Sequence, residues 1–159
     1  MGRKWIPVLP LLIVVAVVAG CGQTTPAKIR AFTYTSTFVA AQTASSLMLS
    51  EGKLTPEELS RVAGVVEEVL GVLDAVDDPG QLYETAYPLV RVYIENAFTA
   101  EQAGLKQLSL MTVSQALVLA QQYADANPEF FADKQEYLEL IRLGLRGAAA
   151  GMRSVALPA

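Results

Sequence analysis

The segment that begins at Thr55 constrains the fold of this chain more than any other. Thr55 is suited to an N-cap, Pro56 to the first helical position and Glu58 to the third, which together form a capping box. Apolar residues then recur at alternating spacings of three and four, which places them on one stripe of a helix. They are Leu59, Val62, Val66, Val69, Leu73 and Val76. The segment therefore predicts an amphipathic helix with one buried side.

The segment before it is ambiguous from its sequence. Residues 32–38, FTYTSTF, alternate aromatic or small side chains with threonines, a pattern typical of a β-strand. A lone strand would leave its backbone N–H and C=O groups unpaired, and nothing later in the chain offers a partner strand. We therefore favour a helix over 27–51, ended by Gly52, and keep a strand at 32–38 as the alternative.

Three more helices are predicted, at about 79–98, 100–126 and 128–152. Pro88 lies inside the first of these and should kink or split it. Thr99 and Gln102 can cap the second. The middle of that second helix is apolar on most sides, so we expect it to be the central and most buried helix of the fold.

These segments predict the architecture of the chain. A length of 159 residues favours one domain, and 52% hydrophobic residues supply a core without any internal disulfide, since there is a single cysteine. Short connections favour antiparallel neighbours, so we expect an all-α, compact antiparallel bundle of about five helices over 28–152, followed by a C-terminal tail at 153–159. A coiled-coil rod is the alternative, but no heptad pattern lasts beyond the helix that begins at Thr55.

The N-terminus has the features of a signal peptide. Two basic residues, Arg3 and Lys4, precede an apolar run over 5–20. Sixteen residues are fewer than the roughly 20 that a membrane span needs. The run closes on Val18-Ala19-Gly20-Cys21, which resembles the lipobox of bacterial lipoproteins.

This resemblance implies cleavage between Gly20 and Cys21 and lipidation of Cys21. Residues 1–20 would then be the signal peptide and 21–27 a lipidated tether that holds the protein on a membrane of the cell envelope. Gly22 stands where an aspartate would favour retention in the inner membrane, so the periplasmic face of the outer membrane is favoured in a host with two membranes. The alternatives are an uncleaved anchor or an ordinary signal peptide with an incidental cysteine.

Composition argues against several classes of function. The chain has 12 basic and 16 acidic residues, a formal charge of −4, and no clustered basic face, so nucleic acid is not an expected partner. Histidine, the usual acid–base group and transition-metal ligand near neutral pH, is absent. We find no GxSxG, P-loop or HExxH motif. We therefore expect no enzyme activity, catalytic residue, metal or cofactor.

Acidic residues occur in two arrangements that could form a site. An acidic cluster over residues 74–85 contains Asp74, Asp77, Asp78 and Glu84. It resembles a calcium loop only superficially, because Pro79 stands where glycine is needed and Thr85 where glutamate is needed. The paired carboxylates of the chain are expected to lie on polar helix faces and to serve solubility. They are Glu57 with Glu58, Glu67 with Glu68, and Glu136 with Glu139.

Small residues and tyrosines are the remaining candidates. Gly144, Gly147 and Gly151 recur near the C-terminus, and a glycine inside a helix costs about 1 kcal/mol relative to alanine. Close approach of another helix would offset this cost, and we favour a helix of the same bundle over another chain or a frayed end. The six tyrosines suit an interface, the rim of a ligand groove or ordinary core edges.

These observations favour a lipid-anchored envelope protein that binds another envelope protein and has no catalytic activity. The layout loosely resembles that of small accessory lipoproteins of bacteria and their phages. Such proteins act as assembly, envelope-lysis or exclusion factors, among which the sequence does not choose. The alternative is a small helical carrier that encloses an apolar ligand such as a lipid.

Overall fold

The protein is described by a computed structural model that covers residues 25–74, 87–130 and 133–156. These residues form five α-helices and one short 3₁₀ helix, and they contain no strand. The elements are α2 (Pro26–Ser50), α3 (Pro56–Asp74), α4 (Tyr87–Ala97), η3 (Ala100–Gln102), α5 (Ala103–Ala126) and α6 (Lys134–Ala156). The prediction of an all-α bundle is confirmed.

Local sequence signals set the ends of the first two helices. The side chain of Thr25 accepts a hydrogen bond from the backbone N–H of Lys28 and so caps α2. Residues 32–38 are helical, so the strand alternative is wrong. After α2 the chain turns through Gly52, whose φ is 66°. The capping box of α3 is present: the N–H of Thr55 donates to the Glu58 carboxylate (2.9 Å), and the N–H of Glu58 donates to the Thr55 hydroxyl (3.2 Å).

The later helices differ in detail from their predicted bounds. Pro88 lies in the first turn of α4, where proline is tolerated. Residues 75–86, the first part of the helix predicted at about 79–98, lie outside the described residues. The N–H of Thr99 donates to the side chain of Gln102 (3.2 Å), and the turn that follows is the 3₁₀ helix that leads into α5. Helix α6 continues to Ala156, so residues 153–156 of the predicted tail are helical.

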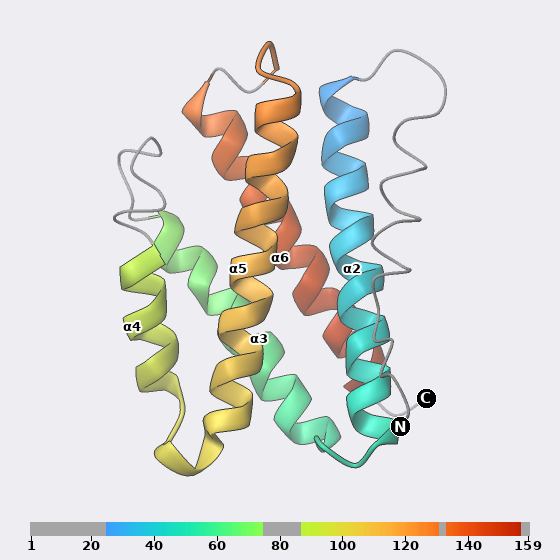
Figure 1. The fold of residues 1–159 in the computed structure, drawn as a ribbon, viewed down its shortest axis with the longest axis vertical. Coiled ribbons are helices and arrows are strands. Elements are labelled where there is room, and N and C mark those ends of the chain that lie inside the picture. Colours follow the sequence, from blue (N-terminus) through green and yellow to red (C-terminus); the bar gives the residue numbers. More distant parts are fainter. Residues whose placement is uncertain (1–24, 75–86, 131–132, 157–159) are drawn as a thin grey trace, which may run out of the picture.

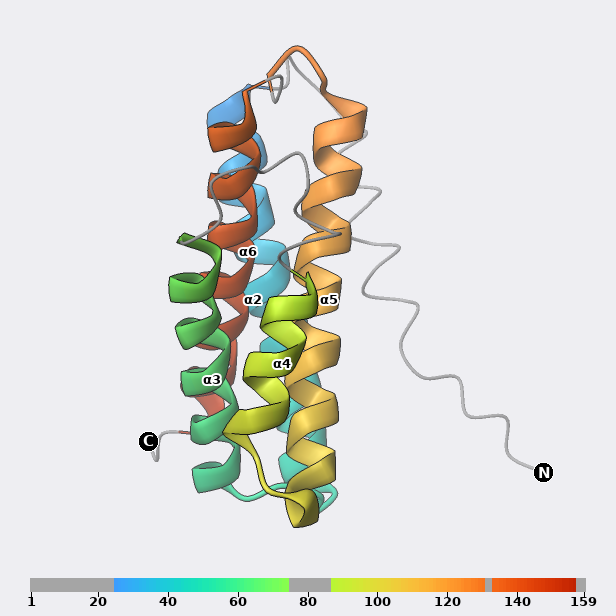
Figure 2. The same cartoon turned by 90° about the vertical axis from the view of Figure 1, so that its left-hand side faces the viewer.

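Consecutive helices alternate in direction, as the short connections predict, and five alternating helices leave the first and the last pointing the same way (Figure 1). Helices α2 and α6 lie side by side in this parallel orientation and form the most extensive helix pair of the bundle. Figure 2, turned by 90°, shows α4 next to α5 on the other side of the molecule. The bundle is thus closed by its first and last described helices. This pair is parallel, as is the contacting pair of α3 and α5, and both depart from the expected antiparallel arrangement.

The central helix is α6, so the prediction that residues 100–126 would form it is wrong. Helix α6 packs against α2, α3 and α5. Leu138, Ile141 and Leu145 are fully buried on it, whereas α5 leaves Met111 and Val118 exposed. The reason is volume: glycine and alanine on one side of α6 admit a neighbouring helix closely, while leucine and isoleucine fill the space on the other sides.

Candidate interaction surface

The residues predicted from the lipobox resemblance lie outside the described part of the chain. Gly20 and Cys21 precede Thr25, which is the first described residue and the N-cap of α2. Asp77, Asp78 and Glu84 of the acidic cluster also lie outside it. Among the described residues, no helix combines the length and apolar character that crossing a membrane requires. The same residues contain no group of three or more acidic, cysteine or histidine side chains placed to hold a metal ion.

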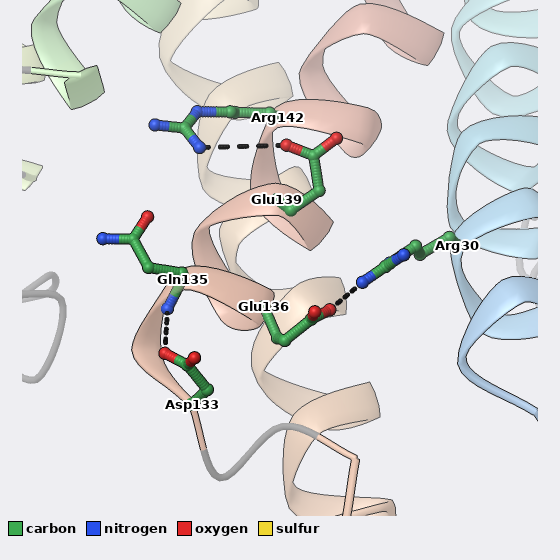
Figure 3. Close-up of polar contacts among 6 residues, drawn as sticks. All are labelled: Arg30, Asp133, Gln135, Glu136, Glu139 and Arg142. Carbon is green, nitrogen blue, oxygen red and sulfur yellow. Dashed lines mark hydrogen bonds and ion pairs between the residues drawn. The ribbon is translucent and has the colours of Figure 1, made fainter.

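Glu136 and Glu139, the last pair of carboxylates, contact two different arginines (Figure 3). Glu136 forms an ion pair with Arg30 of α2, so it ties the start of α6 to the start of α2. Glu139 faces Arg142 on its own helix, with 3.8 Å between the charged atoms. The two carboxylates therefore point to different partners and do not converge on one site.

The Glu67 and Glu68 pair is divided in the same way. Glu67 forms an ion pair with Arg153 of α6. Glu68 accepts a hydrogen bond from the hydroxyl of Tyr93 on α4. Neighbouring carboxylates of α3 thus bind groups on two different helices, and Glu58 of the remaining pair belongs to the capping box.

The glycines of α6 meet α2 along what we call the glycine seam, formed by Gly147 and Gly151. A Cβ atom built on Gly147 would lie 2.4 Å from both the hydroxyl of Thr37 and the carbonyl oxygen of Tyr34. A Cβ atom on Gly151 would lie 2.3 Å from the carbonyl oxygen of Phe38. The backbones of the two helices are therefore too close for any side chain at these positions. These glycines therefore admit another helix of the same bundle, which is the interpretation that the sequence favours.

The side of α2 that faces the bundle carries hydroxyl groups where a core would ordinarily be apolar. Thr33, Ser36 and Ser45 are buried there. The Thr33 hydroxyl donates to the carbonyl of Ile29 (2.9 Å), and the Ser36 hydroxyl donates to the carbonyl of Thr33 (3.1 Å). Short side chains bonded to their own helix leave no unpaired hydroxyl in these two cases and occupy little space. The buried side chains on the inner side of α2 thus share a small volume rather than an apolar character.

The opposite side of α2, which we call the outer face, is exposed and uncharged. Val39 (43% exposed) and Leu47 (45%) lie on it. Other exposed residues of this stretch include Ala31, Thr35, Ala40, Thr43, Ala44, Ser46 and Ser50. No acidic or basic residue occurs between residues 31 and 50. Exposed apolar side chains with no charge over five helical turns are typical of a protein contact rather than of a solvated helix surface.

The other helices present charges to the solvent. Exposed or half-exposed ionic groups include Glu57 on α3, Arg91 on α4, Lys106 on α5 and Arg146 on α6. Helix α4 also exposes Leu89 and Val92, but Arg91 lies between these two positions in the sequence. The outer face of α2 therefore differs from the surfaces of α3, α4 and α6. Residues 107–124 of α5 are also uncharged, but the exposed positions of that stretch include four glutamines, Gln107, Gln115, Gln121 and Gln122.

A groove of roughly 500 Å³ lies between α3 and α4. It is open to solvent and is lined by Arg61, Gly64, Val65, Glu68, Tyr93, Asn96 and Ala97. A guanidinium, a carboxylate and an amide on the walls give it a mixed polar character. An apolar ligand would require an enclosed pocket with mostly apolar walls, so this groove does not fit the carrier hypothesis.

Tyrosines occupy the edges of helix contacts in three described cases. The Tyr93 hydroxyl donates to Glu68, and this hydrogen bond raises the pKa of Tyr93 to about 12. Tyr123 packs edge-on against Phe32 of α2, and burial raises the pKa of Tyr123 to about 12. The Tyr137 hydroxyl donates to Gln121 of α5 (2.8 Å).

Comparison of the chain with protein-family models, with curated protein sequences and with solved structures finds no match. Sequence reasoning did not single out the outer face of α2, although its signal was present as a run of twenty residues, 31–50, without a charge. That signal is ambiguous in a sequence, because an uncharged helix can equally be buried. The exposure of Val39 and Leu47 resolves the ambiguity.

Proposed function

We propose that this protein is a lipid-anchored component of the bacterial cell envelope that acts by binding a protein partner and catalyses no reaction. The lipid on Cys21 would hold it at the membrane, at the periplasmic face of the outer membrane in a host with two membranes. The helical body would be an accessory module for assembly, envelope lysis or exclusion. The anchor rests on the resemblance of residues 18–21 to a lipobox.

The outer face of α2 is the observation that carries the binding role. Burying exposed apolar side chains on a partner is favourable by about 25 cal/mol for each Å² removed from water. An uncharged face also loses no ionic hydration when a partner covers it. Both properties favour a protein contact at Val39 and Leu47.

The anchor is tested by intact mass and membrane fractionation of the full chain next to a Cys21→Ala variant. We expect the wild type to lose residues 1–20, to gain the mass of lipid and to sediment with membranes, and the variant to do neither. Equal behaviour of the two chains would refute the anchor.

The binding role is tested by placing a photo-crosslinking residue at position 39 and, as a matched control, at position 118. Val39 on α2 and Val118 on α5 are exposed to nearly the same extent, 43% and 41%. We expect adducts in the envelope from position 39 and few from position 118. Equal labelling at both positions would show that the outer face of α2 has no special role.

A further inference from the structure

We infer that α4 detaches from the bundle as one unit while α2, α3, α5 and α6 stay folded. The motion depends neither on the lipid anchor nor on the outer face of α2, so it goes beyond the proposed function. Three observations carry it: the place of α4 in the bundle, the few groups that hold it there, and its weak tendency to form a helix alone.

Helix α4 lies outside the group of helices that surrounds α6. Among the described elements, α6 packs against α2, α3 and α5, whereas α4 packs against α3 and α5. Figure 1 shows α4 at the left edge of the bundle, and Figure 2 shows it alongside α3 and α5. Detachment of α4 therefore breaks no contact between the central helix and its three neighbours.

Few side chains hold α4 in place. Val90 and Ile94 are its two buried residues, and Phe98 is buried just beyond its C-terminal end. The other residues of this helix are half-buried or exposed, including Leu89 (51% exposed) and Val92 (56%). Helix α6, in contrast, has buried apolar residues from its second turn to its end. Since burial of apolar area is the main force that holds a helix on a bundle, α4 is held less firmly than α6.

Polar contacts between α3 and α4 lie at the surface. Arg61 of α3 donates a hydrogen bond to the carbonyl of the last residue of α4 (3.0 Å), and Tyr93 of α4 donates one to Glu68 of α3. Arg61 and Glu68 are exposed, so water competes for both contacts. The ion pair between Arg91 and Glu95 lies within α4 and does not tie this helix to the bundle.

Once detached, α4 has little to keep it helical. Its 11 residues are fewer than the roughly 12–15 that give even marginal stability to an isolated helix in water. Val90, Val92 and Ile94 are β-branched, which lowers helix propensity. Its first turn has no acidic residue and its last turn no basic residue to offset the helix dipole. Detachment and unfolding of α4 therefore occur together, and the chain entropy gained in this way favours opening.

Opening exposes apolar surface that the closed bundle hides. Val65 of α3 (6% exposed) lines the groove between α3 and α4 together with Tyr93 and Ala97. Loss of α4 leaves Val65 facing solvent, along with the side of α5 on which α4 packs. The protein thus has a transient apolar surface in addition to the permanent one on the outer face of α2.

The test measures how readily buried thiols react in the full chain with Cys21→Ala, in which an introduced cysteine is the single thiol. Val90→Cys on α4 and the control Val66→Cys on α3 replace valines that are 1% and 0% exposed. The rate of labelling by an aromatic disulfide reagent is divided by the rate for the same variant unfolded in urea. We expect position 90 to react at least about tenfold faster than position 66. Its rate should also depend less on urea, because local opening exposes less surface than global unfolding.

A core substitution separates opening of α4 from unfolding of the whole bundle. Ile141→Val removes a buried methyl group from α6 and should accelerate labelling of Val66→Cys by about two- to tenfold. Labelling of Val90→Cys should not change, because α4 packs on α3 and α5 and opens while α6 stays folded. Hydrogen exchange of the unsubstituted chain, followed by mass spectrometry, makes the same comparison without a cysteine. The amides of 92–97 should exchange faster than those of 141–149.

Equal rates and equal urea dependences at positions 90 and 66, including no labelling at either, would show that α4 opens only with the whole bundle. Equal acceleration of both by Ile141→Val would lead to the same conclusion. If a cysteine variant fails to fold, hydrogen exchange decides, and equal protection of 92–97 and 141–149 overturns the inference. These results leave the anchor and the outer face of α2 untouched, since both are tested separately.

Discussion

Alanine at Gly147 should destabilise the bundle, whereas alanine at Gly144 should stabilise it. The two glycines lie on the same helix, three residues apart. A Cβ atom at Gly147 would lie 2.4 Å from the carbonyl oxygen of Tyr34 and from the hydroxyl of Thr37. A Cβ atom at Gly144 would meet its nearest neighbour, the side chain of Ala116, at 3.5 Å, an ordinary contact distance.

The expected magnitudes follow from these contacts. In both variants alanine gains about 0.5–1 kcal/mol of helix propensity over glycine. At Gly147 the inserted methyl group also forces α2 and α6 apart, and such overpacking costs typically about 1–3 kcal/mol. We expect the free energy of unfolding to rise by about 0.5–1 kcal/mol for Gly144→Ala and to fall by about 1–2 kcal/mol for Gly147→Ala. Gly151→Ala should resemble Gly147→Ala, because its nearest contact is the backbone carbonyl of Phe38.

Urea denaturation followed by circular dichroism measures these differences, on the chain without residues 1–21, which removes no described residue. A difference of about 1.5–3 kcal/mol between the variants at Gly144 and Gly147 is well above the error of such fits. Removing the hydroxyl with Thr37→Ala should not rescue Gly147→Ala, because the Tyr34 carbonyl remains in the way. Equal stability of the two glycine variants would refute the close contact along the glycine seam.

Three further perturbations test other parts of the structure. Leu145→Ala removes a fully buried side chain of the central helix and should lower the free energy of unfolding by about 2–5 kcal/mol in the same urea assay. Thr55→Ala removes the cap of α3 and should lower the free energy of unfolding by about 1 kcal/mol. An unchanged free energy of unfolding would show that the cap is not formed. The pKa of both Tyr93 and Tyr123 is raised to about 12, so the folded state holds protons that the unfolded state loses near pH 10, and stability should fall as the pH rises from 10 to 12. Glu68→Gln should shift the ultraviolet titration of Tyr93 back toward pH 10, and an unchanged titration would show that the hydrogen bond to Glu68 does not control this pKa.

The parts of the fold that were predictable are those determined by residues close in sequence. The capping box at Thr55 and the stripe that follows it are local, and both are present in the structure. The turn at Gly52 is local as well. Helix existence and approximate bounds therefore follow from the sequence, together with the alternation of direction that short connections impose.

The pairing of α2 with α6 was not predictable, because its contacts join residues more than 100 positions apart. Nothing near Gly147 identifies Tyr34 as its neighbour. The expectation that residues 100–126 would be central failed for a related reason. Mean apolarity does not decide which helix is surrounded, and α6 is surrounded because its small residues admit α2 closely.

The sequence did not identify the candidate surface, because the usual pattern of buried apolar and exposed polar residues is reversed in α2. Thr33 and Ser36 are buried while Val39 and Leu47 are exposed, so hydrophobicity assigns the two sides of α2 the wrong way round. The cause is the close approach of α6, which requires small side chains on the inner side and leaves larger ones on the outer side. The absence of charge over 31–50 is the part of the signal that a sequence retains.

The parallel alignment of α2 and α6 also determines how the bundle responds to force. A pull applied at the N-terminal end of α2 along the helix acts on its contacts with α6. The contacts that resist it, from Arg30 with Glu136 at one end to Gln42 with Ser154 at the other, are spread along that axis. They are therefore loaded together in shear and cannot be peeled apart one at a time. Helix α2, the first described helix, is thus held in a geometry that withstands tension applied at its N-terminal end.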